Sequence, residues 1–535
     1  MYSLIDLFAG AGGLSLGFAQ TGRFKIITAA ENNKNARATY EANHSVLDIK
    51  SDVKEIDYKK LIEGYGEIDV IIGGPPCQGF SNANRQKTMV LSTNNNLVKE
   101  FVRAVREVKP RVFVMENVKM IRSEIHRFYC SQSEYNEMKS YGIELKDDQI
   151  VLLDKTICSQ LSCPMNTIID NYKNFIWDEP HYNLINVLFH VRNNNRKLHD
   201  AILRYQHKLN LFCGLAKDTK NEVPAYADIE NKLCRLIGYS IQHKTIDFNL
   251  HSFIEKAISI QRMLRCYKEL IDNNILIKQM KYADGVRACV LSCSVIEYIY
   301  KILGASPLNY KIDQGLFNAA EFGAPQKRIR NIIIGSMNHL PAMPRGTFSQ
   351  ENFRTVQDAI GDLEDIMPET EITAPPKTIM AYTNNMPNGG LECLRDSNLL
   401  FNHITTSTRE VAMSRFKALK PGQNFHDLAF SLKSTYSNIQ RTQNTIYKRL
   451  DYNKPSDTVL NIRKSMWIHP KKDRALSVRE AARLQTFPDS FKFLGTKDSQ
   501  YQQVGNAVPP ILAKAVAEAV IKTLESGGEH DGQSQ

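Results

Sequence analysis

The sequence predicts an α/β protein in which a mostly parallel sheet is interrupted by a largely helical insertion and followed by a smaller basic domain. Three observations predict this fold. Short apolar runs that end in glycine or proline turns alternate with helical patterns in residues 1–121. Helical spacing prevails from 122 to 294, and the α/β alternation returns after 295. Much of the net charge of +11 arises between residues 401 and 477.

The length of 535 residues predicts more than one domain. We expect an α/β domain in two parts, an insertion between them, a smaller domain, a closing helix that packs back on the α/β domain, and a disordered tail. The expected bounds, in that order, are 1–121 with 295–340, 122–294, 341–498, 499–525 and 526–535.

Bulk features argue against membrane, secreted and metal-binding classes. No apolar run approaches the ~18 residues of a membrane span, and the strand pattern from Tyr2 is unlike a secretory signal. Ten cysteines without paired spacing indicate reduced thiols in a cytoplasmic protein. The closest pairs, Cys158/Cys163 and Cys289/Cys293, form no four-ligand pattern, so no metal site is expected.

The first strand, expected at Leu4–Phe8, leads into the glycine turn Ala9–Gly13 and then into a helix. Such a turn lets a ligand approach the backbone closely. It is not the dinucleotide fingerprint, because Ser15 stands where a third glycine is required. The turn therefore predicts a ligand site that does not require a phosphate.

A second strand, expected at Phe24–Ala30, ends in Glu31. An acid at this position suits the hydroxyl groups of a ribose. The alternative is a charge that favours the N-terminus of the following helix, and the upstream glycine turn makes the ribose role the preferred one. Asp52 ends a short connector and is placed to accept a hydrogen bond from an adenine amino group.

The turn Gly73–Ser81 follows the apolar run Ile68–Ile72. Its glycines permit unusual backbone conformations, and its prolines stiffen the exit from the strand. Cys77 is thereby expected at the carboxyl end of a parallel strand, where α/β sheets bind ligands, and it is a candidate nucleophile. The polar stretch Ser81–Asn96 is expected to form a long loop, or lid, beside it.

A candidate acid follows on the next strand. A helix is expected at Leu97–Val108, ended by Pro110, before the strand Arg111–Met115. That strand brings Glu116 to the same edge of the sheet as Cys77. A carboxylate at this edge is a candidate general acid.

After the insertion, the α/β pattern predicts a helix near Val295–Leu303 and a strand at Asn331–Gly335. The basic cluster Gln326–Arg330 directly precedes this strand. Because burying unpaired cations is costly, the cluster is expected to face an acidic or phosphate-bearing ligand. A short helix at Ser477–Thr486 and a closing helix at Ile511–Leu524 follow.

The basic stretch from 401 to 477 holds 14 Lys and Arg residues against 5 Asp and Glu residues. It is either a solvated surface or a face that binds a polyanion. The aromatic residues Tyr436, Tyr447, Tyr452 and Trp467 lie among the charges. This mixture favours nucleic acid as the partner.

Six segments carry these features in a fixed order: Asp6–Gly13, Gly74–Ser81, Glu116–Val118, Gln326–Arg330, Arg479–Pro488 and Gly505–Pro510. Together they resemble the motifs of the cytosine-C5 DNA methyltransferases, in particular those of bacterial restriction-modification systems. The resemblance covers residues 1–121 and 295–525. It implies the Rossmann-like sheet of S-adenosylmethionine-dependent methyltransferases, with a target-recognition domain at 341–498.

The resemblance also implies a chemistry. The Cys77 thiolate attacks C6 of a cytosine, so that C5 becomes electron-rich and accepts the methyl group of S-adenosylmethionine. Glu116 protonates N3, while Arg328 and Arg330 hold the base, a phosphate and Glu116. Because the target atom lies inside duplex DNA, the cytosine has to be flipped out.

Binding residues follow from the same resemblance. The implied cofactor-binding residues are Phe8, Gly10, Gly12, Glu31, Asp52, Pro76 and Asn506. The implied DNA-binding residues are Gln78, Ser81, Arg449, Arg463 and Lys464. The implied partners are double-stranded DNA and a cognate restriction endonuclease, and a monomer in the bacterial cytoplasm, associated with the nucleoid, is expected.

The insertion at 122–294 departs from the family pattern. It is either an extra domain that contacts DNA or a partner, or a tolerated addition. Two alternative functions are a tRNA cytosine-C5 methyltransferase of the same fold and a non-catalytic regulator that binds cofactor and DNA. The insertion and the large basic region argue against the first, and the set of Cys77, Glu116 and Arg330 argues against the second.

Overall fold

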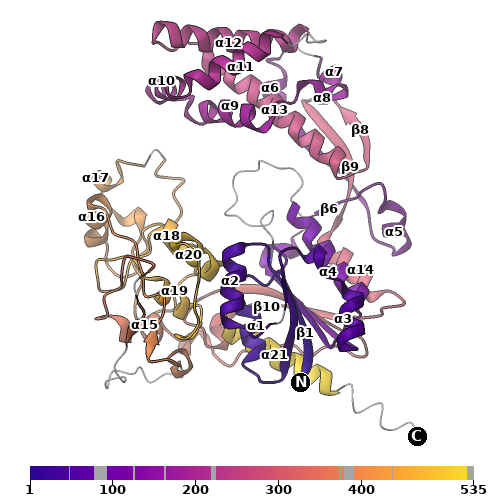
Figure 1. Cartoon of the computed structure of the whole chain (residues 1–535), viewed down its shortest axis with the longest axis vertical. Helices are drawn as coiled ribbons and strands as arrows, with labels where there is room; N and C mark the ends of the chain where they lie inside the picture. The colour runs from indigo at the N-terminus through magenta and orange to yellow at the C-terminus, as the bar shows by residue number, and fades with distance from the viewer. Residues whose placement is uncertain are drawn as a thin grey trace. The chain divides into compact units, whose positions relative to one another are not determined.

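The chain forms two compact units in this computed structural model (Figure 1). The structure describes all residues except 47, 77–92, 124–126, 162–163, 219–223, 374, 379–390, 437 and 527–535. Among the described residues, the first unit comprises 1–76, 96–123 and 302–526. The second comprises 127–301 together with 93–95.

The first unit is built on a seven-stranded sheet in the order β10-β11-β5-β4-β1-β2-β3. The strands are β1 (Tyr2–Leu7), β2 (Phe24–Ala30), β3 (Ile49–Lys50), β4 (Val70–Gly73), β5 (Val112–Val118), β10 (Lys311–Asn318) and β11 (Ile329–Ser336). The first five run parallel to one another, whereas β11 is antiparallel to both β5 and β10. Central strands such as β4 are buried along their whole length, which explains their continuous apolar runs.

Helices cover both faces of this sheet (Figure 1). Val112 and Val114 of β5 share one core with helix α21, while Phe113, on the opposite face, packs edge-on against Phe101 of α4. The helices around the sheet are α1 (Gly13–Ala19), α2 (Lys34–Asn43), α3 (Tyr58–Tyr65), α4 (Thr93–Val108), α20 (Lys497–Asn506) and α21 (Pro510–Ser526). The helix expected from Leu97 thus begins at Thr93, and β10 was not predicted.

The closing helix α21 packs against α1, where Gly17 permits close approach. A Cβ atom built on Gly17 would lie 2.4 Å from the Cβ atom of Ala513. The stretch Lys497–Ser526 is long and apolar enough to span a membrane by length and composition, contrary to the expectation from sequence, but 61% of its most apolar window is buried. This burial is that of a core helix of the α/β domain.

The expected smaller domain at 341–498 is not a separate compact unit. Its helices are α15 (Val356–Ile360), α16 (Glu410–Ala418), α17 (Phe430–Lys433), α18 (Ile462–Ser465) and α19 (Val478–Leu484), with the short strands β12 (Lys377–Thr378) and β13 (Leu399–Leu400). Trp467 and Phe487 share a core with Ala11 of the glycine turn and with Ala507. A second, smaller core surrounds Phe416.

The second unit contains the expected helices. It also contains a sheet that the sequence did not predict. In this four-stranded antiparallel sheet, β9 (Val286–Ser294) pairs with β6 (Arg127–Tyr129), β7 (Lys146–Leu153) and β8 (Ile277–Lys281). Its helices are α5 (Tyr135–Ser140), α6 (Lys155–Cys158), α7 (Met165–Asp170), α8 (Tyr172–Phe175), α9 (Glu179–Val191), α10 (Asn195–Arg204), α11 (Gln206–Asp218), α12 (Pro224–His243) and α13 (Leu250–Asp272). Helix α14 (Val295–Gly304) crosses the boundary between the units.

Candidate active site

The predicted site residues converge on one edge of the large sheet. The parallel strands place the residues that follow Leu7, Ala30, Gly73 and Met115 side by side, because these four positions are in register across neighbouring strands. The antiparallel β11 begins at this same edge, with Arg330 opposite Val118. The glycine turn, the nucleophile turn, the candidate acid and the basic cluster therefore meet there.

The glycine turn adopts a left-handed backbone at three positions: Phe8 at φ 59°, Gly10 at φ 56° and Gly12 at φ 90°. This conformation is costly for Phe8, and such strain is often stored at functional sites. The Gly10 amide donates to Oε2 of Glu31 at 2.8 Å, and the Asn33 amide donates to Oε1 at 2.7 Å. A Cβ atom on Gly10 would meet nothing within 4 Å, so a ligand has room against this backbone.

A buried polar cluster beneath the turn was missed from the sequence. Asp6 accepts hydrogen bonds from the hydroxyl groups of Ser15 and, at 3.1 Å, Tyr40. Burial raises the pKa of Asp6 to about 7, although both hydrogen bonds oppose the shift. His44 lies over the turn, with Nε2 3.2 Å from the carbonyl oxygen of Gly12, and burial lowers its pKa to about 4. The signal was a carboxylate inside an otherwise apolar strand.

Other predicted cofactor residues lie nearby. Burial also raises the pKa of Glu31, against the effect of its two backbone donors. Asp52 is exposed and accepts a hydrogen bond from the Lys54 amide at 3.0 Å. Asn506 is exposed at the end of α20 and accepts from Gln502 at 2.7 Å.

The turn that precedes Cys77 lies directly against the acid. A Cβ atom on Gly74 would be 3.0 Å from Oε2 of Glu116. The side chain of Asn117 donates to the carbonyl oxygen of Pro75 at 3.1 Å, which fixes the turn to β5. Cys77, Gln78 and Ser81 lie outside the described residues, as does the predicted loop up to residue 92. Pro76 is the last described residue before the nucleophile position.

Glu116 and Arg330 form a nearly buried ion pair. Arg330 Nε lies 2.8 Å from Glu116 Oε1, with the two side chains 12% and 13% exposed. Burial raises the pKa of Glu116, while Arg330 and then Arg328 lower it. The balance favours the protonated form more than in water, as a proton donor requires.

Arg328, predicted to hold the substrate together with Arg330, has its recorded hydrogen bonds inside the protein. Its side chain is fully buried, and its guanidinium donates to the carbonyl oxygens of Val459 at 2.9 Å and Gly505 at 3.0 Å. Arg328 therefore ties the start of β11 to two distant segments. Its charge lowers the pKa of Glu116.

Comparison with known proteins decides the family. The family model for C-5 cytosine-specific DNA methylases matches residues 2–154 and 301–522. The chain belongs to the C-5 cytosine-specific DNA methylases. The predicted methyltransferase fold and the predicted activity, methylation of cytosine at C5 in DNA, are thereby confirmed. The unmatched residues 155–300 fall within the second unit.

Individual relatives agree with this assignment. The chain is 26% identical over 525 residues to the type II methyltransferase M1.HphI of Haemophilus parahaemolyticus, covering 97% of this chain and 86% of that protein. It is also 26% identical over 548 residues to the DNA (cytosine-5-)-methyltransferase M.ApeKI of Aeropyrum pernix, covering 98% and 99%. A candidate DNA modification methyltransferase encoded within an E. coli prophage shares the fold, with a TM-score of 0.53 and 20% identity over 98% of this chain and 100% of that one.

In this methylase, much of the basic stretch serves the protein's own structure. Arg449, predicted to contact DNA, is only 4% exposed. Its guanidinium donates to the carbonyl oxygens of Phe416 and His469 and to the carboxylate of Asp473. Arg415 is likewise buried and donates to the Tyr447 hydroxyl at 2.8 Å.

The remaining cations of the stretch divide into paired and unpaired groups. Arg463 and Lys464, both predicted to bind DNA, lie 3.0 and 3.8 Å from the carboxylate of Asp498. Within the described part of the stretch, the exposed cations for which the structure records no ion pair are Arg409, Lys417, Lys420 and Arg441. A polyanion would meet these four most directly.

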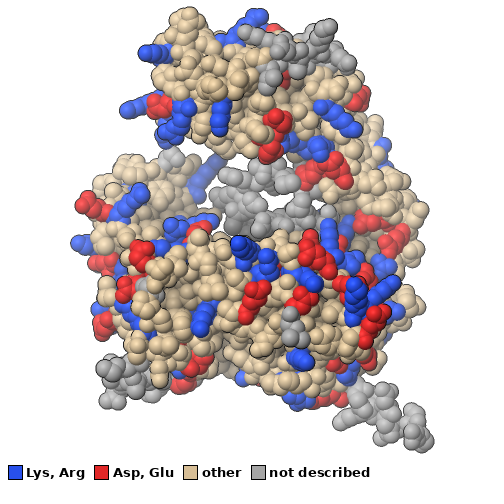
Figure 2. Space-filling model, viewed as in Figure 1, with Lys and Arg blue, Asp and Glu red and all other residues tan. Residues whose placement is uncertain are grey.

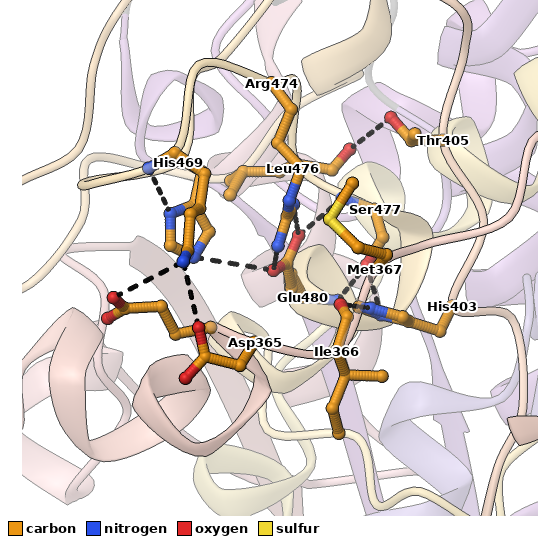
Figure 3. Close-up of polar contacts among 12 residues, drawn as sticks. Asp365, Ile366, Met367, His403, Thr405, His469, Arg474, Leu476, Ser477 and Glu480 are labelled. Carbon is orange, nitrogen blue, oxygen red and sulfur yellow. Dashed lines mark hydrogen bonds and ion pairs between the residues drawn. The ribbon is translucent and has the colours of Figure 1, made fainter.

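The methylase motif at Arg479–Pro488 is also structural. Figure 3 shows Arg474 and Glu480 directed at one another, with His469 beside them. Arg474 donates to both carboxylate oxygens of Glu480, at 2.6 and 2.8 Å. Burial raises the pKa of Glu480, but Arg474 outweighs it and lowers the value to about 2.

Two buried histidines join this network (Figure 3). His403 Nδ1 lies 3.0 Å from the Ser477 hydroxyl oxygen, and its Nε2 lies 2.8 Å from the Ile366 carbonyl oxygen. His469 Nδ1 accepts from the Lys471 and Lys472 amides. Burial lowers the pKa of His403 and that of His469, the latter to about 4. The network holds the segments around His403, His469 and Arg474 onto α19.

Proposed function

We propose that this methylase transfers a methyl group from S-adenosylmethionine to C5 of a cytosine flipped out of a specific duplex sequence, through a covalent bond between Cys77 and C6. The observation that carries the proposal is the Glu116–Arg330 pair beside the Gly74–Pro76 turn. An acid whose pKa is raised by burial and a cation fixed to it stand next to the nucleophile position, at the same sheet edge as the glycine turn.

The residues of the glycine turn fit S-adenosylmethionine. Open space at Gly10, the partly exposed ring of Phe8 and the carboxylate of Glu31 suit an adenosine with its ribose hydroxyls. Glu31 keeps its orientation through the Gly10 and Asn33 amides. Asp52 binds the adenine amino group, while Gly12, Pro76 and Asn506 line the methionine end. When bound, S-adenosylmethionine supplies an electrophilic methyl group.

The chain's own groups make C5 of cytosine nucleophilic. The Cys77 thiolate forms a bond to C6, and the displaced electron pair moves through C5 while Glu116 delivers its proton to N3. Arg330 orients Glu116 and stabilises the charge that develops on the base. After C5 has accepted the methyl group, a base removes the C5 proton, the Cys77–C6 bond breaks, and Glu116 regains its proton from N3.

DNA binding completes the proposal. The exposed cations Arg409, Lys417, Lys420 and Arg441 contact phosphates, with Arg463 and Lys464 joining when they exchange Asp498 for DNA. Gln78 and Ser81 contact the strand around the flipped cytosine. The enzyme acts as a monomer in the bacterial cytoplasm, on nucleoid DNA. As the type II names of its relatives suggest, it protects the sequence that a partner endonuclease cuts.

Bisulfite sequencing of DNA from cells that express the chain tests this function. The proposal expects methylation of one cytosine in a fixed sequence context, and none when the Cys77→Ser variant is expressed. Purified wild-type enzyme should also transfer labelled methyl groups to duplex DNA and not to tRNA. Methylation of tRNA alone, or methylation by Cys77→Ser at the wild-type level, would refute the proposal.

A further inference from the structure

The second unit carries an unequal distribution of charge. Between Arg192 and Lys208, five Lys and Arg residues face one acid, Asp200, whereas the rest of Glu124–Lys301 holds 18 Lys and Arg residues and 20 Asp and Glu residues. The excess is therefore confined to α10 and its two flanks. Figure 2 shows Lys and Arg side chains gathered on the side of this unit that carries α10, with little acidic surface among them.

Four of these cations form what we call the basic face of α10: Arg196, Lys197 and Arg204 of α10 itself, and Lys208 in the first turn of α11. All four side chains are exposed, and the structure records no ion pair for any of them among the described residues. The fifth cation, Arg192, is bound to Glu255 at 2.9 Å and lies over the ring of Phe189.

Cations elsewhere in the same unit commonly do have acidic partners. Lys155 pairs with Asp284, Arg265 with Glu179, and Lys278 with Asp147. Isolated surface ion pairs contribute little to stability. These pairs matter here because they contrast with the four cations of the basic face, for which no ion pair is recorded among the described residues. Other exposed lysines without a recorded ion pair, such as Lys139 and Lys301, lie far apart in the sequence, whereas the basic face of α10 gathers four such cations within 13 residues.

The basic face also opposes the stability of its own helix. Arg196 and Lys197 occupy the first turn of α10, where the macrodipole favours acids, and no acid is present in that turn. The opposite side of α10 is ordinary core, with Leu198 and Ile202 fully buried. Folding thus accounts for the apolar side of the helix and not for the charged one.

We infer that the basic face of α10 binds the phosphate backbone of duplex DNA, so that the second unit is an additional, sequence-independent DNA-binding element. Helix α10 has 10 residues and is about 15 Å long, which is roughly the length of four to five base pairs. The exposed amide side chains of Asn193 and Asn195 stand beside the cations and suit phosphate oxygens. The choice of DNA as the polyanion rests on the proposed function.

Salt dependence of DNA binding by the full-length chain tests this inference. The variant Arg196→Gln/Lys197→Gln/Arg204→Gln/Lys208→Gln is compared with Lys139→Gln/Lys173→Gln/Lys281→Gln/Lys301→Gln, which removes four exposed lysines of the same unit outside α10 and α11. For the basic-face variant, the slope of log affinity against log salt should become shallower by about 3, with affinity at low salt falling at least 10-fold. The control should keep the wild-type slope.

Equal slopes for the basic-face variant, the control and the wild type would overturn the inference, as would weaker binding of tRNA with unchanged binding of DNA. The two half-variants, Arg196→Gln/Lys197→Gln and Arg204→Gln/Lys208→Gln, should each give part of the change, which guards against misfolding of one protein. Methyl transfer by the wild type is measured in parallel. Its absence would count against the proposed function, whereas unchanged slopes with wild-type methylation would count against the basic face alone.

Discussion

Glu116 shows how a single residue acquires its chemistry from opposing influences. Burial raises its pKa, and the Arg330 guanidinium at 2.8 Å lowers it. A carboxylate that was simply buried would hold its proton too firmly, and one that was simply paired would never carry it. Burial is the larger influence, so the pKa of Glu116 stays above its ordinary value beside the turn that leads to Cys77.

We expect Glu116→Gln to reduce the turnover number by about 10²- to 10⁴-fold, because the amide keeps the shape of the side chain and cannot deliver a proton. Single-turnover methyl transfer at saturating DNA measures this step. The matched control is Glu63→Gln, at an exposed position on α3, which should behave as the wild type. Turnover of Glu116→Gln within twofold of the wild type would contradict the assigned role.

The sequence predicted Glu116 because a buried strand with a polar end is a local pattern. It could not predict the fate of Arg328, two residues from Arg330 in the same basic cluster. Arg328 is held by the carbonyl oxygens of Val459 and Gly505, more than 100 residues away along the chain. Which of these two arginines pairs with Glu116 and which is held by carbonyl oxygens is decided by such distant partners.

At the scale of the element, the glycine turn is a strained loop that packs against side chains of α2 and its end. Phe8, Gly10 and Gly12 take left-handed conformations, and His44 fills the space that a side chain at Gly12 would need. The sequence indicated the turn from its glycines. It did not indicate the support, because Tyr40 and His44 come from α2 and its end, after the next strand.

Gly12→Ala should therefore fail in two ways. Its φ of 90° is unfavourable for alanine, and the new Cβ atom would lie 2.2 Å from His44 Nε2. Gly22→Ala is the matched control, with φ of 68° and nothing within 4 Å. The control should lose about 1–2 kcal/mol of unfolding free energy, whereas Gly12→Ala should lose more and raise the KM for S-adenosylmethionine at least 10-fold. Equal losses with an unchanged KM would show that His44 does not support the turn.

At the scale of the whole molecule, the fold sorts the chain's charges into internal and external groups. The stretch from 401 to 477 appeared in the sequence as one basic surface. In the structure, Arg415, Arg449 and Arg474 are buried among carbonyl and acidic groups. Counting charges predicted the class of partner and could not separate these two groups.

Two variants distinguish the buried cations of this stretch from the exposed ones. Arg449→Gln should lower the unfolding free energy by about 3 kcal/mol or more, because it leaves several buried carbonyl oxygens without donors. It should leave the salt slope of DNA binding unchanged under conditions where the protein is folded. Lys417→Gln/Lys420→Gln should do the reverse, with wild-type stability and a slope reduced by up to about 2. Thermal unfolding and salt titrations measure both, and identical behaviour of the two variants would contradict the sorting.

Buried histidines also give the whole molecule a pH-dependent stability. His469 has its pKa lowered to about 4, below its unfolded value of 6.5, so the unfolded chain binds more protons between these values. Its contribution is present above pH 6.5 and is lost as the pH falls toward 4. Asp6, with its pKa raised to about 7, acts in the opposite sense, so the wild-type curve alone cannot isolate either group.

The comparison of wild type with His469→Gln isolates the contribution of His469 to the pH dependence of stability. Between pH 6.5 and 4, the wild type should lose up to about 3 kcal/mol more unfolding free energy than the variant. Chemical denaturation at a series of pH values measures the difference. His243→Gln, at an exposed position on α12, is the control and should follow the wild type. A parallel course of wild type and His469→Gln would show that His469 is not held neutral by the fold.

The second unit marks the limit of prediction at this scale. Its helices were predicted from their spacing, but the sheet around β9 was not, because β7 begins with the polar run Lys146–Gln149, in which no residue is buried, and its buried residues are confined to the second half. Strand pairs such as Lys146 with Ser292 join segments separated by most of the insertion. A pattern read along the chain does not reveal pairings of that range.

Trapping with duplex DNA that carries 5-fluorocytosine at the target position tests the central claim most directly. Fluorine at C5 prevents the final loss of a proton, so the bond between Cys77 and C6 should persist after methyl transfer. We expect a denaturation-resistant protein–DNA adduct for the wild type, with the peptide that contains Cys77 carrying the modified base, and no adduct for Cys77→Ser. Methylation of ordinary DNA without any adduct on the fluorinated duplex, or an adduct formed by Cys77→Ser, would contradict it.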